Sequence, residues 1–160
     1  MLIANLGRTR RRLLASLDGL SDEQLNRSPG NGRWSIGQVV WHLCNAERSI
    51  VETVLNALPA TSGTVEERDV SLLIEPYENS QAETALPMGV LTKAELIRLL
   101  EESRFAHLQY VFNKTHERSL AEKAVDHPLF GNISLKNLID FIWLHEQYHV
   151  DRIEEAKKSL

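Results

Sequence analysis

The sequence is poor in cysteine: Cys44 is the only one among 160 residues. A single cysteine excludes a disulfide within the chain, and a domain of this length needs none, because folding buries about 68–70% of its unfolded surface. No apolar run reaches the roughly 20 residues of a membrane-spanning helix. The first residues also lack a signal-peptide core, since their arginines lie within the apolar pattern. We therefore expect a cytoplasmic protein with no membrane partner.

The sequence also lacks an excess of basic residues. Lys and Arg number 18 against 22 Asp and Glu, which gives a formal charge of −4. Nucleic acids and anionic membranes both require a positive surface for general affinity. The one basic cluster, Arg8 and Arg10 to Arg12, fits the solvated face of a first helix. These observations argue against a nucleic-acid partner and leave a small-molecule substrate as the expectation.

No stretch shows a convincing strand alternation, whereas four long stretches have apolar residues at helical spacing. Two of these open with capping boxes, Ser35 with Gln38 and Thr92 with Glu95, in which each side chain caps the other's backbone. The predicted long helices run from Leu2 to near Gly19, from Ser35 to Pro59, from Thr92 to about Thr115, and from Ser134 to Leu160. Four amphipathic helices bury their apolar stripes most simply in a four-helix bundle, so we expect an all-α fold in a single domain, residues 1–160.

The connections between the long helices are harder to interpret. Ser21 with Gln24 predicts a short turn of helix, and residues 127–132 read as a loop. The segment from Thr61 to Gly89 has the weakest pattern: Val65 to Ile74 fits a short helix, and Pro76 and Pro87 bracket a polar loop. We expect a lid or a crossover there.

The last helix carries two histidines, His145 and His149, on or beside its apolar stripe. A buried imidazole without a partner costs free energy. Residues four apart on a helix have Cβ atoms about 5–6 Å apart, and zinc reaches an imidazole nitrogen at about 2.0–2.1 Å. The pair therefore predicts a two-histidine clip for a divalent metal.

An open metal site usually has three protein ligands, so a third is expected from elsewhere. His42 is the best candidate, because it flanks the apolar face of the second long helix and approaches the clip if that helix packs on the last one. By itself, a histidine in such a place is more often an ordinary core residue. His107 is the next candidate, whereas His116 and His127 fit a helix end and a loop. Cys44 points away from His42 around the helix and fits packing.

The stretch HEQYH, His145 to His149, also matches the HExxH pattern of zinc peptidases. The eleven residues after His149 lack the HExxHxxGxxH continuation, and no substrate-aligning strand is visible. A peptidase is therefore disfavoured. Glu146 is a candidate proton acceptor beside the metal, with hydrogen bonding to a neighbour or exposure to solvent as the alternatives.

Three stretches together resemble a known family. WSIGQVVWHL at Trp34 to Leu43, HPLFG at His127 to Gly131 and the His145/His149 pair are similar, in order and spacing, to the DinB-like (YfiT-type) metalloprotein superfamily. The resemblance covers nearly the whole chain. It implies a DinB-like four-helix bundle with a long crossover loop between helices two and three. It also implies a metal triad with one histidine from helix two, which by position is His42, His145 and His149.

The resemblance implies an enzyme that uses a divalent metal ion, and histidine ligands with open positions suit zinc, nickel or iron alike. The family includes S-transferases and isomerases that use a low-molecular-weight thiol, and many members described as metal-dependent hydrolases. We expect a small-molecule thiol S-transferase, with a hydrolase and a non-enzymatic bundle with a structural metal as alternatives. Arg33, Arg48 and Arg104 are the arginines considered for an anionic thiol, with a solvated helix face as the more common role of such residues. Val51 and Leu55, outside the main stripe of their helix, suggest a homodimer.

Overall fold

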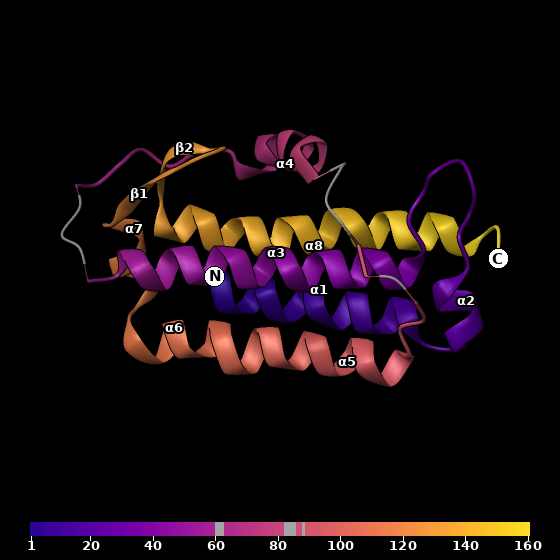
Figure 1. Cartoon of the computed structure of the whole chain (residues 1–160). Coiled ribbons are helices and arrows are strands. Elements are labelled where there is room, and N and C mark those ends of the chain that lie inside the picture. The colour runs from indigo at the N-terminus through magenta and orange to yellow at the C-terminus, as the bar shows by residue number, and fades with distance from the viewer. Residues whose placement is uncertain (60–62, 82–85, 88) are drawn as a thin grey trace.

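The computed structural model describes residues 1–59, 63–81, 86–87 and 89–160 (Figure 1). In chain order its helices and strands are α1 (Leu2–Leu17), α2 (Asp22–Asn26), α3 (Ile36–Ala57), the 3₁₀ turn η1 (Val70–Leu73), α4 (Ile74–Gln81), α5 (Lys93–Glu101), the π-helical η2 (Glu102–Leu108), α6 (Gln109–Lys114), α7 (Glu117–Ala121), β1 (Ala124–His127), β2 (Gly131–Ser134) and α8 (Leu135–Lys157). None of the helices in these ranges is long and apolar enough to cross a bilayer.

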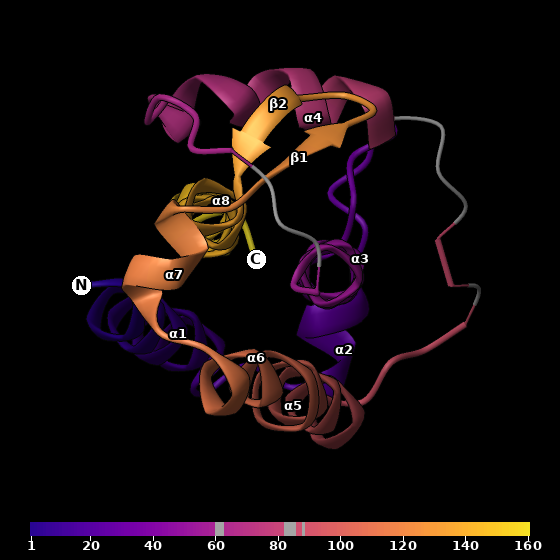
Figure 2. The same cartoon turned by 90° about the vertical axis from the view of Figure 1, so that its left-hand side faces the viewer.

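Four long helical segments form a bundle: α1, α3, the continuous rod α5–η2–α6, and α8. Seen end on in Figure 2, they lie around a common axis, with α8 next to α1 and α3 next to α5. The contacts agree with this view, because α8 packs on both α1 and α3, and α3 also packs on α5 and η2. The predicted all-α four-helix bundle is confirmed.

The helix starts follow the capping residues seen in the sequence. Ser35 accepts a hydrogen bond from the backbone N–H of Gln38 at 3.1 Å, and Gln38 Oε1 accepts one from the backbone N–H of Ser35 at 2.9 Å. Thr92 and Glu95 do the same for α5. Such caps satisfy backbone donors that have no partner within the helix. The apolar stripes then fill the bundle interior, where Val40 of α3 and Phe141 of α8 are fully buried.

One prediction was wrong: the segment before α8 contains a β-hairpin. β1 pairs antiparallel with β2, with Ala124 opposite Ser134 and His127 opposite Gly131. The hairpin turn, residues 128–130, lies within the predicted loop at 127–132, and His127 Nδ1 accepts the backbone N–H groups of Leu129 and Phe130 at 3.1 Å. Two strands of four residues are too short to show an alternation, and Ser134 both ends β2 and caps α8.

The crossover between α3 and α5 also differs from the prediction in its described part; residues 60–62, 82–85 and 88 lie outside that part. Helix begins at Val70 rather than Val65 and continues through Pro76 to Gln81. Arg68 donates its backbone N–H to Asn137 Oδ1 of α8 at 2.9 Å, so this N–H bonds to α8 instead of forming a helical hydrogen bond. Pro76 is tolerated because it lies in the first turn of α4. This anchoring places α4 over α3 and α8 (Figures 1 and 2).

The third long helix contains an unpredicted π-helical stretch, Glu102–Leu108. Single π turns often occur at functional or strained positions. Here the stretch includes Arg104, which reaches into the bundle and donates Nη1–H to the carbonyl of Leu6 at 3.0 Å.

The side chain of Val51 is only 1% exposed and belongs to the core. It therefore cannot form part of a dimer surface, and Leu55, which is half-buried, packs against the same core. The homodimer stays a prediction without its original support.

Candidate metal centre

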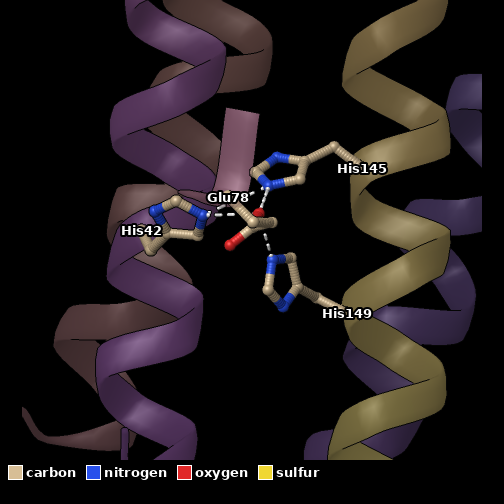
Figure 3. Close-up of side chains that lie close together, drawn as sticks. All are labelled: His42, Glu78, His145 and His149. Carbon is tan, nitrogen blue, oxygen red and sulfur yellow. Dashed lines mark hydrogen bonds and ion pairs between the residues drawn. The ribbon is translucent and has the colours of Figure 1, made fainter. Parts of the chain in front are cut away.

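The packing of α3 on α8 brings together the three histidines that the sequence analysis singled out. His145 and His149 lie one turn apart on α8, and His42 faces them from α3 (Figure 3). All three are buried, with 3%, 1% and 4% of His42, His145 and His149 exposed. The Nε2 atoms of His42 and His145 are 3.2 Å apart.

A fourth residue, Glu78, joins the cluster from α4. Its Oε1 atom lies 3.0 Å from His42 Nε2 and 2.7 Å from His149 Nε2, and it also contacts His145 Nε2. One potential ligand atom from each of these four residues lies within 4.8 Å of the other three. The cluster therefore draws on three separate elements: α3, α4 and α8.

Burial and hydrogen bonding set the protonation of His145, His149 and Glu78. Desolvation lowers the pKa of His145 to about 4, although its hydrogen bond to Glu78 opposes this change. The pKa of His149 is lowered for the same first reason. For Glu78, burial alone would raise the pKa, but hydrogen bonds from the three imidazoles outweigh it and hold the pKa well below its usual range. Neutral imidazoles and an ionised carboxylate are the forms that bind metal ions.

Aromatic rings hold the imidazoles in position. Phe141 stacks on His145 with 5.0 Å between ring centroids, and Trp34 meets His42 edge-on at 4.8 Å. Tyr148 lies edge-on to His149 at 5.0 Å. Because the rings are packed on their faces and edges, the orientation of the Nε2 atoms is set before any ligand binds.

This donor set fits a divalent metal ion. Two imidazoles bound at about 2.0–2.1 Å in adjacent positions of one tetrahedral or octahedral ion have nitrogens about 2.8–3.4 Å apart, and the separation between His42 and His145 falls in that range. Imidazole nitrogens with one carboxylate suit zinc, nickel and iron alike. That His42, His145 and His149 bind a metal remains a prediction, but the structure brings the three together.

Glu146, the candidate proton acceptor, lies in a different environment. It is not a member of the four-residue cluster. Its Oε1 accepts a hydrogen bond from Thr9 Oγ1 at 2.8 Å, and its Oε2 accepts from Arg10 Nε at 3.0 Å and Arg104 Nη2 at 3.4 Å. Both oxygens are therefore engaged by α1 and η2, which corresponds to the alternative of hydrogen bonding to a neighbour.

Glu47 of α3 completes this second group of buried charges. Its Oε1 accepts hydrogen bonds from Arg104 Nη2 at 2.8 Å and Arg10 Nη2 at 3.4 Å. The side chains of Glu47 and Glu146 are 2% and 3% exposed. Two carboxylates and two guanidinium groups thus tie α1, α3, η2 and α8 together, and Arg104 is not available to a substrate.

The remaining candidates lie away from the cluster. His107 pairs with the carbonyl of Glu102, His116 precedes α7, and His127 is in the hairpin turn stacked on Phe130. Cys44 is buried among apolar side chains, and burial raises its pKa to about 12.

A cavity of about 720 Å³ opens beside the cluster of three histidines and Glu78. Glu78 and His149 form part of its lining, together with Arg33 and Trp34 from the loop before α3 and Arg152 from α8. Among the described residues, neither Arg33 nor Arg152 has a carboxylate partner, and the guanidinium carbon of Arg152 lies 3.6 Å from the centroid of the Tyr148 ring. Of the arginines considered from the sequence, Arg33 alone lines this cavity, since Arg48 lines a separate groove.

Sequence reasoning missed Glu78 because its role depends on a contact between α4 and two distant helices. The segment 61–89 gave no periodic signal, and exposed glutamates are common. The neighbouring Tyr77, which is only 9% exposed, turns one side of α4 toward the core, but this burial is a property of the folded chain and no signal in the sequence.

Comparison with known proteins supplies a family for this geometry. The model of the DinB superfamily matches residues 5–153. The chain is 28% identical over 150 residues to the uncharacterized protein YuaE of Bacillus subtilis (strain 168), covering 90% of this chain and 90% of YuaE. It is also 28% identical over 148 residues to a protein of Oceanobacillus iheyensis named "Putative metal-dependent hydrolase OB0413", covering 91% of this chain and 77% of that protein.

Two solved structures share the fold. YfiT from Bacillus subtilis, described as a probable metal-dependent hydrolase with an unusual four-helix bundle topology, matches with a TM-score of 0.67 at 19% identity and covers 99% of this chain and 85% of its own. TT2238, described as a four-helix bundle protein, matches with a TM-score of 0.63 at 18% identity and covers 96% of this chain and 94% of its own. At these identities the likeness concerns the fold.

Proposed function

The chain belongs to the DinB superfamily, and on this premise we propose that it is a metal-dependent enzyme that acts on a small molecule in the cavity beside the histidine cluster. The observation that carries the proposal is the convergence of three buried imidazoles at the edge of that cavity. A closed site with no access would instead favour a structural metal. Here His149 belongs to both the cluster and the cavity lining.

His42, His145 and His149 would hold the ion, and aromatic packing would fix their orientation. A divalent zinc, nickel or iron ion held there supplies a Lewis acid that lowers the pKa of a thiol or a water molecule towards neutrality. The proton that the thiol or water loses needs an acceptor nearby. Among the described residues, Glu78 is the carboxylate at the cluster and takes this role in place of Glu146.

The first reaction we propose is S-transferase chemistry: the sulfur of a small anionic thiol loses its proton and bonds to an electrophilic carbon, and the leaving group on that carbon departs with the electron pair of the broken bond. Arg33 and Arg152 line the cavity without carboxylate partners among the described residues, and a guanidinium group binds a carboxylate through two parallel hydrogen bonds. Trp34, Val39 and Ile153 offer apolar surface for the body of an electrophile. The cavity therefore suits two ligands, one anionic and one largely apolar.

Hydrolysis is the second candidate, in which water replaces the thiol. The names given to OB0413 and YfiT favour it, because both are described as metal-dependent hydrolases. The same cluster and the same acceptor, Glu78, serve this reaction, so the two candidates differ in the nucleophile rather than in the site.

The metal site is tested by elemental analysis of protein purified without chelator or affinity nickel. We expect about one divalent ion per chain in the wild type and its loss in His42→Ala, His145→Ala and His149→Ala. His107→Ala is the matched control and should retain the ion, because His107 lies outside the cluster. Full metal content and affinity in His42→Ala would show that the triad is wrong.

The reaction is tested with metal-loaded protein and an electrophilic reporter, supplied with a panel of cellular thiols, and separately with ester and amide substrates. Thiol-dependent conjugation that is lost in His149→Ala supports S-transfer. In that case Arg33→Gln should raise the KM of an anionic thiol but not of a neutral one, and Arg48→Gln should change neither. Ester or amide turnover without a thiol would overturn S-transfer in favour of hydrolysis, and failure of both assays would favour a structural metal.

A further inference from the structure

Glu78 has a position in the cluster that no other described carboxylate shares. Its Oε1 atom lies 3.0 Å from Nε2 of His42 and 2.7 Å from Nε2 of His149, and it also contacts Nε2 of His145 (Figure 3). We call this position, close to all three Nε2 atoms, the shared point. An ion bound equally to the three imidazoles would lie close to this point. The carboxylate is therefore directed at the ion site from the crossover segment, which joins two helices of the bundle.

Contacts of α4 and of the residues just before η1 hold Glu78 in this place. The neighbouring Tyr77 is buried, and its ring lies 5.0 Å from that of Phe141 and 5.3 Å from that of His145. Ahead of α4, Asn137 of α8 binds the backbone of Arg68 and the carboxylate of Glu67, the latter at 2.7 Å. These contacts fix α4 against α8, so the position of Glu78 does not depend on its own side chain alone.

A carboxylate ligand lies about 2.0–2.2 Å from a metal ion. Oε1 lies 2.7–3.0 Å from the Nε2 atoms of His149 and His42, farther than the about 2.0–2.1 Å of a metal–imidazole bond, so an ion at the shared point requires Oε1 to move outward by only part of a bond length. The direction with room for this movement is the cavity, because the Glu78 side chain is 18% exposed and forms part of the cavity lining. A substrate atom that approaches the ion from the cavity must reach the same side.

We propose that Glu78 is a fourth protein ligand of the ion, and that it is exchangeable: it binds on the cavity side and gives way to an entering ligand. The inference rests on the proposed metal site. It adds a consequence that three histidines alone do not have, which is competition between a carboxylate of the chain and any anion that enters through the cavity. Metal affinity and anion affinity should then change in opposite directions when Glu78 is altered.

The test uses cobalt(II) as a spectroscopic ion and azide as an exogenous anion. Glu78→Gln keeps the size of the side chain and removes its charge, and Glu78→Asp keeps the charge but shortens the reach. Glu75→Gln, on the exposed side of the same helix, is the matched control. Cobalt affinity is measured by competition with a chromophoric chelator, the ligand field by visible absorption, and azide affinity by titration of the cobalt protein.

We expect Glu78→Gln to bind cobalt at least about tenfold more weakly, with an altered visible spectrum, and to bind azide more tightly than the wild type. Glu78→Asp should fall between the two, and Glu75→Gln should match the wild type. Unchanged affinity and spectrum in Glu78→Gln would overturn the proposal, as would weaker cobalt binding with an unchanged spectrum and azide affinity. If no cobalt binds even to the wild type, the proposed metal function fails as well. If cobalt binding is lost in His149→Ala but unchanged in Glu78→Gln, the role proposed for Glu78 is wrong and the proposed metal site stands.

Discussion

Replacement of Glu146 by Gln should weaken the fold without removing the metal. The side chain is 3% exposed and receives hydrogen bonds from Thr9, Arg10 and Arg104. Loss of the Glu146 charge leaves Glu47 as the one buried carboxylate of this group to pair with both Arg10 and Arg104. Breaking a buried ion pair from one side costs about 3–5 kcal/mol. Since about 2–4 °C of Tm accompany each kcal/mol in a domain of this size, the melting temperature should fall by about 6–20 °C.

Urea unfolding followed by circular dichroism measures this cost, and elemental analysis measures the bound metal. With a total stability of about 10 kcal/mol, the middle of the usual range, the variant keeps about 5–7 kcal/mol and stays folded at room temperature, so both quantities are accessible. Glu154→Gln, an exposed change on the same helix, should alter stability by no more than about 0.5 kcal/mol. The reasoning is refuted if Glu146→Gln unfolds like the wild type while its metal-dependent activity disappears, because Glu146 would then act in the chemistry rather than in the fold.

Three further predictions follow from buried groups and from the surface. Because burial raises the pKa of the Cys44 thiol to about 12, iodoacetamide should label it only after unfolding, and rapid labelling of the folded protein would contradict its burial. Burial and the nearby Glu78 raise the pKa of Tyr77 to about 12, whereas an unfolded tyrosine ionises near about 10. The unfolded state therefore loses its proton first and stability should fall as pH rises between these values, with a flatter profile in Tyr77→Phe. Finally, sedimentation at micromolar concentration tests the homodimer predicted from the sequence, which the buried Val51 no longer supports, and a monomer would dismiss it.

The bundle could be predicted because its determinants are local. The capping boxes at Ser35 and Thr92 and the apolar stripes lie within each helix, and they give α3 and α5 starts that agree with the structure. The place of His42 beside the apolar face of its helix made it the best candidate for the third ligand, and the family resemblance strengthened that assignment. The packing of α3 on α8, which brings His42 next to His145 and His149, appears only in the folded chain.

The hairpin and the crossover could not be predicted in the same way. The register of β1 and β2 depends on pairing between short segments, and the start of η1 depends on Asn137, which is far along the chain from Arg68. Glu78 has no periodic or motif signal at all, because a carboxylate becomes a ligand only through the side chains that tertiary structure places around it. A search for metal ligands that is restricted to motifs therefore finds the histidines and omits the carboxylate.

The HEQYH stretch shows why a motif needs its geometry. On a helix, residues four apart share a face, whereas the residue after the first lies about 100° away around the axis. His145 and His149 accordingly face α3 and α4, while Glu146 faces α1 and η2. In this bundle other helices cover both faces of α8. Glu146 is therefore buried and bonded to Arg10 and Arg104, which leaves it inaccessible to a substrate. The carboxylate beside the histidines is Glu78, which comes from α4. The HExxH sequence therefore supplies two histidines to the predicted metal site, whereas its glutamate stabilises the bundle instead of acting as the general base of a zinc peptidase.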